Sequence, residues 1–140
     1  MTLDKNISNN TNSEAGKLRP SLSLIVYLDD EINKTHDFYK SLEAKYDKSV
    51  YEQFEKRFID LRNKFKAKLQ DISDSDQEFI SKSEMRRKST EQILICATAV
   101  AGKFQEAREH DRLDRSSCTD ALENLLYALK NLRYLIDEKG

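Results

Sequence analysis

The chain contains a stretch of 81 residues, between Pro20 and Gly102, with neither glycine nor proline. These two residue types are the strongest breakers of regular backbone structure, and the whole sequence has only three glycines and one proline. Apolar side chains recur through the stretch every three or four positions, which is the period of an α-helix with one buried face. The stretch therefore predicts that the protein is built from long helices.

The first apolar stripe begins after Pro20 and extends for nearly fifty residues. Its members step by four and three positions: Leu24, Leu28, Ile32, Thr35, Tyr39, Leu42, Tyr46, Val50, Phe54, Phe58, Leu61, Phe65, Leu69 and Ile72. The sequence is locally polar at 46–49, and Ser49 to Glu52 matches the S-x-x-E capping box that begins many helices. Because the stripe keeps its phase through this gap, we expect one continuous helix. A break at Ser49 would give two.

Two polar segments divide the rest of the chain. Residues 71–78 (DISDSDQE) carry four acids and a second capping box, and they predict a helix from about Asp76 to His110 or Leu113. Residues 114–119 (DRSSCT) are rich in N-cap residue types and predict a last helix from about Ser117 to Glu138. Gly102 lies inside the second of these helices among several alanines, so we expect it to permit close helix packing.

These elements predict an all-α fold. We expect an antiparallel bundle of three long helices, or four if the first breaks near Ser49, with coiled-coil-like packing. Residues 1–19 are expected to be a disordered arm and residues 20–140 a single helical-bundle domain. The absence of an apolar signal segment, and of any run near the ~18 apolar residues of a membrane span, predicts a cytoplasmic protein. Cys96 and Cys118 are accordingly expected to be reduced core thiols.

Residue types that carry catalysis are sparse in this sequence. The two histidines are isolated, and only Glu106 and His110 have the i,i+4 spacing of two ligands for one metal. Three scattered glycines cannot form a phosphate-binding loop, and no nucleophile motif is present. We therefore expect no enzyme activity, no metal and no cofactor.

Basic residues gather on both sides of the acidic turn at 71–78. A helical hairpin would bring residues 62–68 level with residues 80–87. We predict a patch that binds phosphate groups on nucleic acid, lipid headgroups or polyphosphate, formed by Arg57, Arg62, Lys66, Arg86 and Arg87. The alternative is that these are ordinary surface charges, supported by i,i+4 neighbours such as Glu84 and Lys88. The net charge of −1 excludes a globally basic nucleic-acid binder.

Surplus apolar surface favours a protein partner. The residues that leave the main stripes, or exceed what a three-helix core needs, form the predicted partner face: Phe38, Tyr51, Leu126 and Leu135. The alternative is that a fourth helix covers them. Our leading hypothesis is a non-enzymatic helical protein–protein interaction module, acting as a scaffold, adaptor or regulatory subunit and forming a homo-oligomer. The second hypothesis is the phosphate-ligand binder.

The segment from Tyr27 to Phe65 (YLDDEINKTHDFYKSLEAKYDKSVYEQFEKRF and onward) resembles the long middle helix of SPX domains, which are inositol-polyphosphate sensors. The shared pattern is an apolar residue, an L-D-x-E-like step, a Lys and then F-Y. The lysine-rich K-I-L-K-K element of that family has no counterpart, since the corresponding positions 132–139 (LRYLIDEK) lack the lysines. The resemblance therefore does not carry phosphate binding over to this chain, and we do not assign the chain to the family.

Overall fold

The computed structural model describes residues 22–43 and 45–137, and this part of the chain contains five α-helices and no strand. The helices are α1 (Leu22–Ser41), α2 (Lys48–Asp71), α3 (Asp74–Ser81), α4 (Glu84–His110) and α5 (Arg115–Asp137). The all-α prediction is confirmed. The predicted arm at residues 1–19 and the helix start at Pro20 lie outside the described residues.

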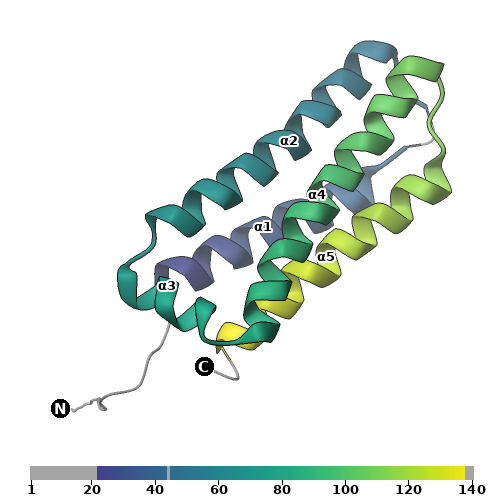
Figure 1. Ribbon diagram of the computed structural model, residues 1–140. Helices are drawn as coiled ribbons and strands as arrows, with labels where there is room; N and C mark the ends of the chain where they lie inside the picture. The colour runs from purple at the N-terminus through teal and green to yellow at the C-terminus, as the bar shows by residue number, and fades with distance from the viewer. Residues whose placement is uncertain (1–21, 44, 138–140) are drawn as a thin grey trace.

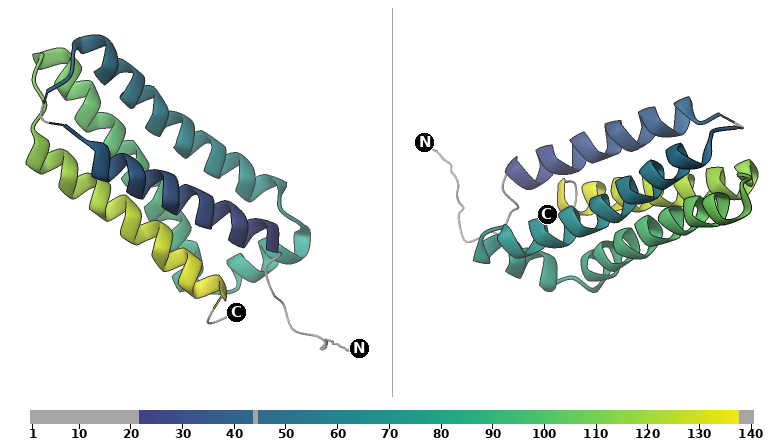
Figure 2. Two further views of the ribbon diagram at one scale, coloured as in Figure 1. Left: turned by 180° about the vertical axis from the view of Figure 1, so that it is seen from behind. Right: turned by 90° about the horizontal axis from the view of Figure 1, so that it is seen from above.

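The four long helices lie side by side, and α3 lies at one end of them (Figure 1). The backbone of α4 packs against both α2 and α5, and that of α1 packs against α5. The start of α1, all of α3 and the end of α5 share one end of the molecule. The segments joining α1 to α2 and α4 to α5 share the other end (Figure 2). Helices far apart in the sequence, such as α1 and α5, are therefore neighbours.

The first apolar stripe is divided between α1 and α2, so the expectation of one continuous helix through Ser49 is wrong. The chain leaves the helix after Ser41, and Asp47 begins α2 by accepting a hydrogen bond from the amide of Val50 at 3.1 Å. The helix is therefore already broken before Asp47 caps α2, two residues ahead of Ser49, where the capping box of the sequence begins. The apolar positions keep the same spacing across the break because α1 and α2 both bury their apolar side in the same core.

Folding back at this break creates contacts that one straight helix cannot make. The ring of Phe38 on α1 lies 4.7 Å from that of Phe54 and 5.1 Å from that of Phe58 on α2, centroid to centroid. Phe104 on α4 completes the group, 5.2 Å from Phe54 and 5.9 Å from Phe38. Most of these pairs are edge-to-face, the arrangement that aromatic quadrupoles favour. The α5 side of the core is aliphatic and fully buried: Leu122, Leu125, Leu129, Leu132 and Ile136.

A short helix, α3, occupies the acidic turn predicted at 71–78. Ser73 caps it by accepting a hydrogen bond from the amide of Asp76 at 3.1 Å. The sequence predicted an uninterrupted helix from about Asp76 to His110, and the break before α4 is a correction to it. Ser83 caps α4 by accepting from the amide of Arg86. The turn therefore contains two breaks, each made by a serine cap without glycine or proline.

Both cysteines are buried and free, as predicted. Burial raises the pKa of the Cys118 thiol to about 11. At neutral pH this side chain is therefore a protonated thiol, which is a poor nucleophile.

Gly102 makes no close packing contact. A Cβ added there would meet no atom within 4 Å, so the expectation that this glycine permits close helix packing is wrong. Gly102→Ala should raise the free energy of unfolding by about 1 kcal/mol, because glycine costs that much inside a helix. Urea denaturation followed by circular dichroism measures the change. A variant less stable than the wild type would show that the position needs glycine.

Candidate functional site

The two arginines predicted to bind phosphate at the start of α4 contact the end of α3. Arg86 donates a hydrogen bond to the carbonyl of Phe79 at 3.0 Å, and its guanidinium carbon lies 3.7 Å from the centroid of the Phe79 ring. Arg87 donates to the carbonyl of Ser81. The last carbonyls of a helix have no partner within the helix. Both arginines are therefore engaged in stabilising α3.

The other three predicted residues lie on different sides of α2. Arg57 reaches toward α1 and donates to the carbonyl of Lys34 at 3.5 Å, whereas Arg62 reaches toward α4 and donates to the hydroxyl of Thr98 at 3.3 Å. Lys66 is exposed. The short helix α3 lies between α2 and α4 and shifts their alignment. Arg62 therefore lies beside Thr98, about four helical turns from the start of α4. The structure therefore does not bring the five predicted residues together as one patch.

The four apolar side chains predicted to meet a partner lie inside the fold. Their exposed fractions are 7% for Phe38, 2% for Tyr51, 7% for Leu126 and 6% for Leu135. The break after Ser41 supplies the fourth long helix that the alternative required, and the rings of α1 and α2 cover each other. The predicted partner face is therefore corrected, because these side chains are not available on the surface of the folded chain.

A cleft of about 390 Å³ lies between α1 and α2. It exists because α1 packs its backbone against α5 and α2 packs against α4, while α1 and α2 meet mainly through aromatic side chains. Three residues of α1 and four of α2 line it: Glu31, Lys34, Thr35, Arg57, Asp60, Leu61 and Lys64. The volume is within the range of sites for small ligands.

Charged side chains of both signs line the α1–α2 cleft. Glu31 is only 9% exposed, and burial raises the pKa of its carboxyl above the ordinary 4.5 despite the opposing influence of Lys34, Lys64 and Arg57. Lys34 is paired with Asp30 at 3.0 Å, one turn before it. The buried acid of the cleft therefore has a raised pKa, and cations of both helices lie near enough to oppose the shift.

Two hydroxyls beside Glu31 are buried, and within the described part of the chain neither has a hydrogen-bond partner. They are Oγ1 of Thr35, a residue 1% exposed, and the phenol oxygen of Tyr27. A helical threonine can donate to a carbonyl one turn back, but Thr35 does not. A buried polar group left unbonded costs about 1–3 kcal/mol. The sequence analysis placed Thr35 in the apolar stripe and did not identify either hydroxyl. A polar residue at a position of that stripe was the one sign that a hydroxyl would be buried there.

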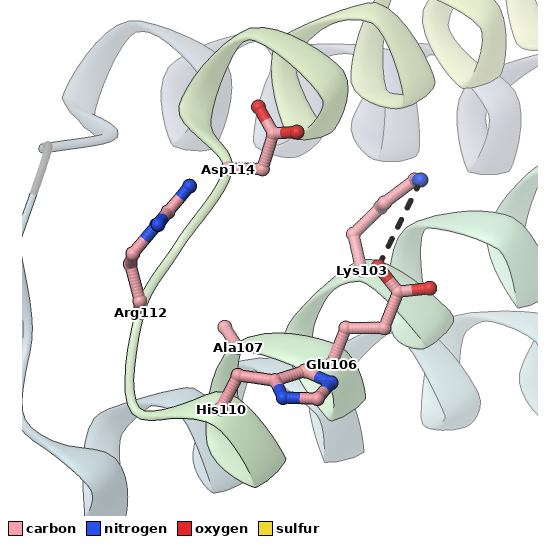
Figure 3. A pocket seen from close by; sticks show the side chains of 6 residues that line it. All are labelled: Lys103, Glu106, Ala107, His110, Arg112 and Asp114. Atoms are coloured by element: carbon pink, nitrogen blue, oxygen red, sulfur yellow. Dashed lines mark ion pairs between the residues drawn. The ribbon is translucent and has the colours of Figure 1, made fainter.

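A second hollow, beside the loop between α4 and α5, contains the Glu106–His110 pair considered as metal ligands. Both residues line it from α4, and Arg112 and Asp114 line it from the loop (Figure 3). Glu106 lies 4.0 Å from Nζ of Lys103, and Asp114 accepts a backbone hydrogen bond at the start of α5. Among residues 22–43 and 45–137, no three His, Cys, Asp or Glu side chains are grouped to hold a metal. The hollow therefore contains local charge pairing and a helix cap.

Exposed apolar side chains concentrate on α4 and α5. Of the five large ones in the described residues, four belong to these helices: Met85 (64% exposed), Ile95 (60%), Tyr127 (73%) and Tyr134 (48%). Ile95 lies in a shallow groove between α4 and α5, beside Gln92, Ala99 and Asn124. We call the surface formed by these residues the α4–α5 face: Met85, Gln92, Ile95, Ala99, Asn124, Tyr127 and Tyr134.

Helical spacing places the members of the α4–α5 face along continuous lines. Met85, Gln92 and Ala99 repeat every seven residues on one side of α4. Tyr127 and Tyr134 repeat at the same interval on α5. None of these side chains carries a formal charge, in a sequence of which 35% is charged. Charged residues of both signs lie beside them, because Lys88 precedes Ile95 by seven residues and Asp120 precedes Tyr127 by seven.

The chain matches no protein-family model, no curated protein and no solved structure. None of the helices in residues 22–137 that the structure describes is both long and apolar enough to cross a bilayer.

Proposed function

We propose that the chain is a non-enzymatic helical interaction module that forms a homodimer through the α4–α5 face. The observation that carries the proposal is the exposure of Met85, Ile95, Tyr127 and Tyr134 on two adjacent helices. Burial of apolar surface favours association by roughly 25 cal/mol per Å². Tyrosine and methionine are also enriched at protein interfaces. The scaffold of the module is an antiparallel bundle of α1, α2, α4 and α5 with coiled-coil-like packing.

The charge distribution of the α4–α5 face favours a second copy of the chain as its partner. A contact with twofold symmetry places the same residues of both copies near the axis, so a charge at the centre would meet its own sign. The named members of the face are uncharged, and the charges beside them are of both signs, Lys88 and Glu91 on α4 and Asp120 on α5, so those of one copy can pair with those of the other. The amides of Gln92 and Asn124 can both donate and accept, so each can pair with its own copy.

Ile95→Glu tests the proposal. We expect light scattering to give about twice 16.3 kDa for the wild type and about 16.3 kDa for the variant. The glutamates would repel each other across the contact and would remove apolar surface that the dimer buries. Ile95 is exposed in the single chain, so the substitution should leave the helical circular dichroism signal unchanged.

Val26→Glu is the matched control, because Val26 is a β-branched apolar residue 56% exposed on α1, away from the α4–α5 face. This variant should remain a dimer. A wild-type chain that stays monomeric at high micromolar concentration would contradict the proposal. Equal dissociation by Ile95→Glu and Val26→Glu would also contradict it.

A further inference from the structure

The geometry points to a ligand site in the α1–α2 cleft that binds a small metabolite through an oxyanion group, a phosphate or a carboxylate. Arg57, Lys64 and the hydroxyl of Thr35 hold that group. The site lies between α1 and α2, whereas the proposed dimer contact is on α4 and α5, so neither depends on the other. Three observations support it: a positioned arginine, cations contributed by both helices, and a buried hydroxyl with no partner among the described residues.

Arg57 is positioned before a ligand arrives. Its guanidinium carbon lies 4.9 Å from the centroid of the Phe38 ring and 5.9 Å from that of Phe58. It also donates to the carbonyl of Lys34 at 3.5 Å, so the side chain bridges α2 and α1. A guanidinium has five N–H donors, and its planar fork matches the two oxygens of a carboxylate or phosphate. One long hydrogen bond to a carbonyl leaves donors for such a ligand.

Lys64 extends the cationic lining along the same helix. It follows Arg57 by seven residues, so both project from the same side of α2. Lys34 adds a third cation from α1 across the cleft, and its ammonium is also paired with Asp30 at 3.0 Å. An anion bound between the helices interacts with charges on both, and within a cleft these interactions are less screened by salt than on an open surface.

Thr35 supplies the hydrogen bond that selects an acceptor. The residue lines the cleft, it is 1% exposed, and its Oγ1 has no hydrogen-bond partner within the described residues. A ligand oxygen placed in the cleft provides the missing acceptor. A purely apolar ligand would leave the hydroxyl unbonded, and an ammonium group has no lone pair with which to accept its proton.

The cleft is lined by more cations than acids, which favours a negatively charged ligand. The lining contains Lys34, Arg57 and Lys64 against Glu31 and Asp60. Burial raises the pKa of the Glu31 carboxyl, but its ionised form repels an oxyanion, whereas its protonated form can donate a hydrogen bond to one. Glu31→Gln should therefore strengthen binding of an anion, because the amide keeps the shape and the donor and removes the negative charge. A ligand bound through an ammonium group would instead lose affinity.

The experiment is an NMR titration of the full chain with pyrophosphate and, separately, with citrate, which distinguishes a phosphate from a carboxylate source. We expect backbone shifts concentrated at residues 31–35 and 57–64. Arg57→Gln and Lys64→Gln should each weaken binding about tenfold or more, the loss of one charge-assisted contact. Thr35→Val should also weaken it while the thermal unfolding temperature does not fall, which separates a ligand contact from structural damage.

Lys66→Gln is the matched control, since Lys66 is exposed on α2 and does not line the cleft. It should change the affinity by less than about twofold. Equal losses from Lys64→Gln and Lys66→Gln would overturn the proposal by showing nonspecific charge attraction. Shifts centred elsewhere, or no binding of either probe at millimolar concentration, would also overturn it. Weaker binding by Glu31→Gln would do the same.

Discussion

Phe38→Ala is expected to lower the free energy of unfolding by about 3–5 kcal/mol, the usual cost of removing a buried phenylalanine ring. The Phe38 ring lies within 5.9 Å, centroid to centroid, of the rings of Phe54, Phe58 and Phe104. These rings come from α2 and α4, so Phe38 connects α1 to both of these helices. Its removal leaves a cavity lined by rigid rings that cannot close around it, and the lost contacts are not replaced.

The fixed position of α1 is a second reason to expect a cost at the upper end of this range. Arg133 on α5 holds Asp29 on α1 at 2.8 Å and Asp137 on its own helix at 2.7 Å. The backbone of α1 also packs directly on α5. The packing on α5 and this ion pair both oppose a shift of α1 toward α2 that would fill the space left by the ring. Sites that relax least lose the most stability.

Urea denaturation followed by circular dichroism measures the effect of Phe38→Ala. Tyr127→Ala is the control, because that ring is 73% exposed and its removal should change stability by no more than about 0.5 kcal/mol. The prediction also tests the correction to the sequence analysis. If Phe38→Ala left stability unchanged but altered the mass of the assembly, Phe38 would belong to a partner face after all.

Helix boundaries were predictable where a few neighbouring residues determine them. The last helix was expected from Ser117 to Glu138, and α5 spans Arg115–Asp137. The end of α4 at His110 agrees with the first of the two predicted ends, His110 or Leu113. In contrast, an apolar stripe in constant phase cannot show whether it is one helix or two folded together, because both arrangements bury the same positions. The break between α1 and α2 was missed for this reason.

The candidate site was less predictable than the helices. The predicted basic patch depended on the register of a helical hairpin, and α3 shifts that register, so of the five residues only Arg57 lines the α1–α2 cleft. Which helix each cation of α2 faces depends on how the neighbouring helices pack: Arg57 reaches α1 and Arg62 reaches α4. Burial of Glu31 and Thr35 depends on the same packing. Spacing along one chain contains no direct information about such neighbours.

Ala97→Asp is expected to have the largest effect of any substitution considered, a loss of about 5 kcal/mol or more. Ala97 is fully buried on α4, which packs between α2 and α5. A carboxylate there would be removed from water without a partner, and an uncompensated buried charge costs about 3–5 kcal/mol before any steric strain is added. Domains of this size are stable by only about 5–15 kcal/mol. We therefore expect the variant to lose most of its helical circular dichroism signal at neutral pH.

Ala99→Asp provides a control with the same chemistry on the same helix. Ala99 is exposed and lies two residues further on, about 200° around the helix axis. This variant should keep the helical signal, and it should weaken the proposed dimer because Ala99 belongs to the α4–α5 face. If Ala97→Asp folded normally and Ala99→Asp did not, α4 would have to be turned with its opposite side toward the core. The pair of variants therefore determines which side of α4 is interior, independently of whether the chain dimerises or binds a ligand.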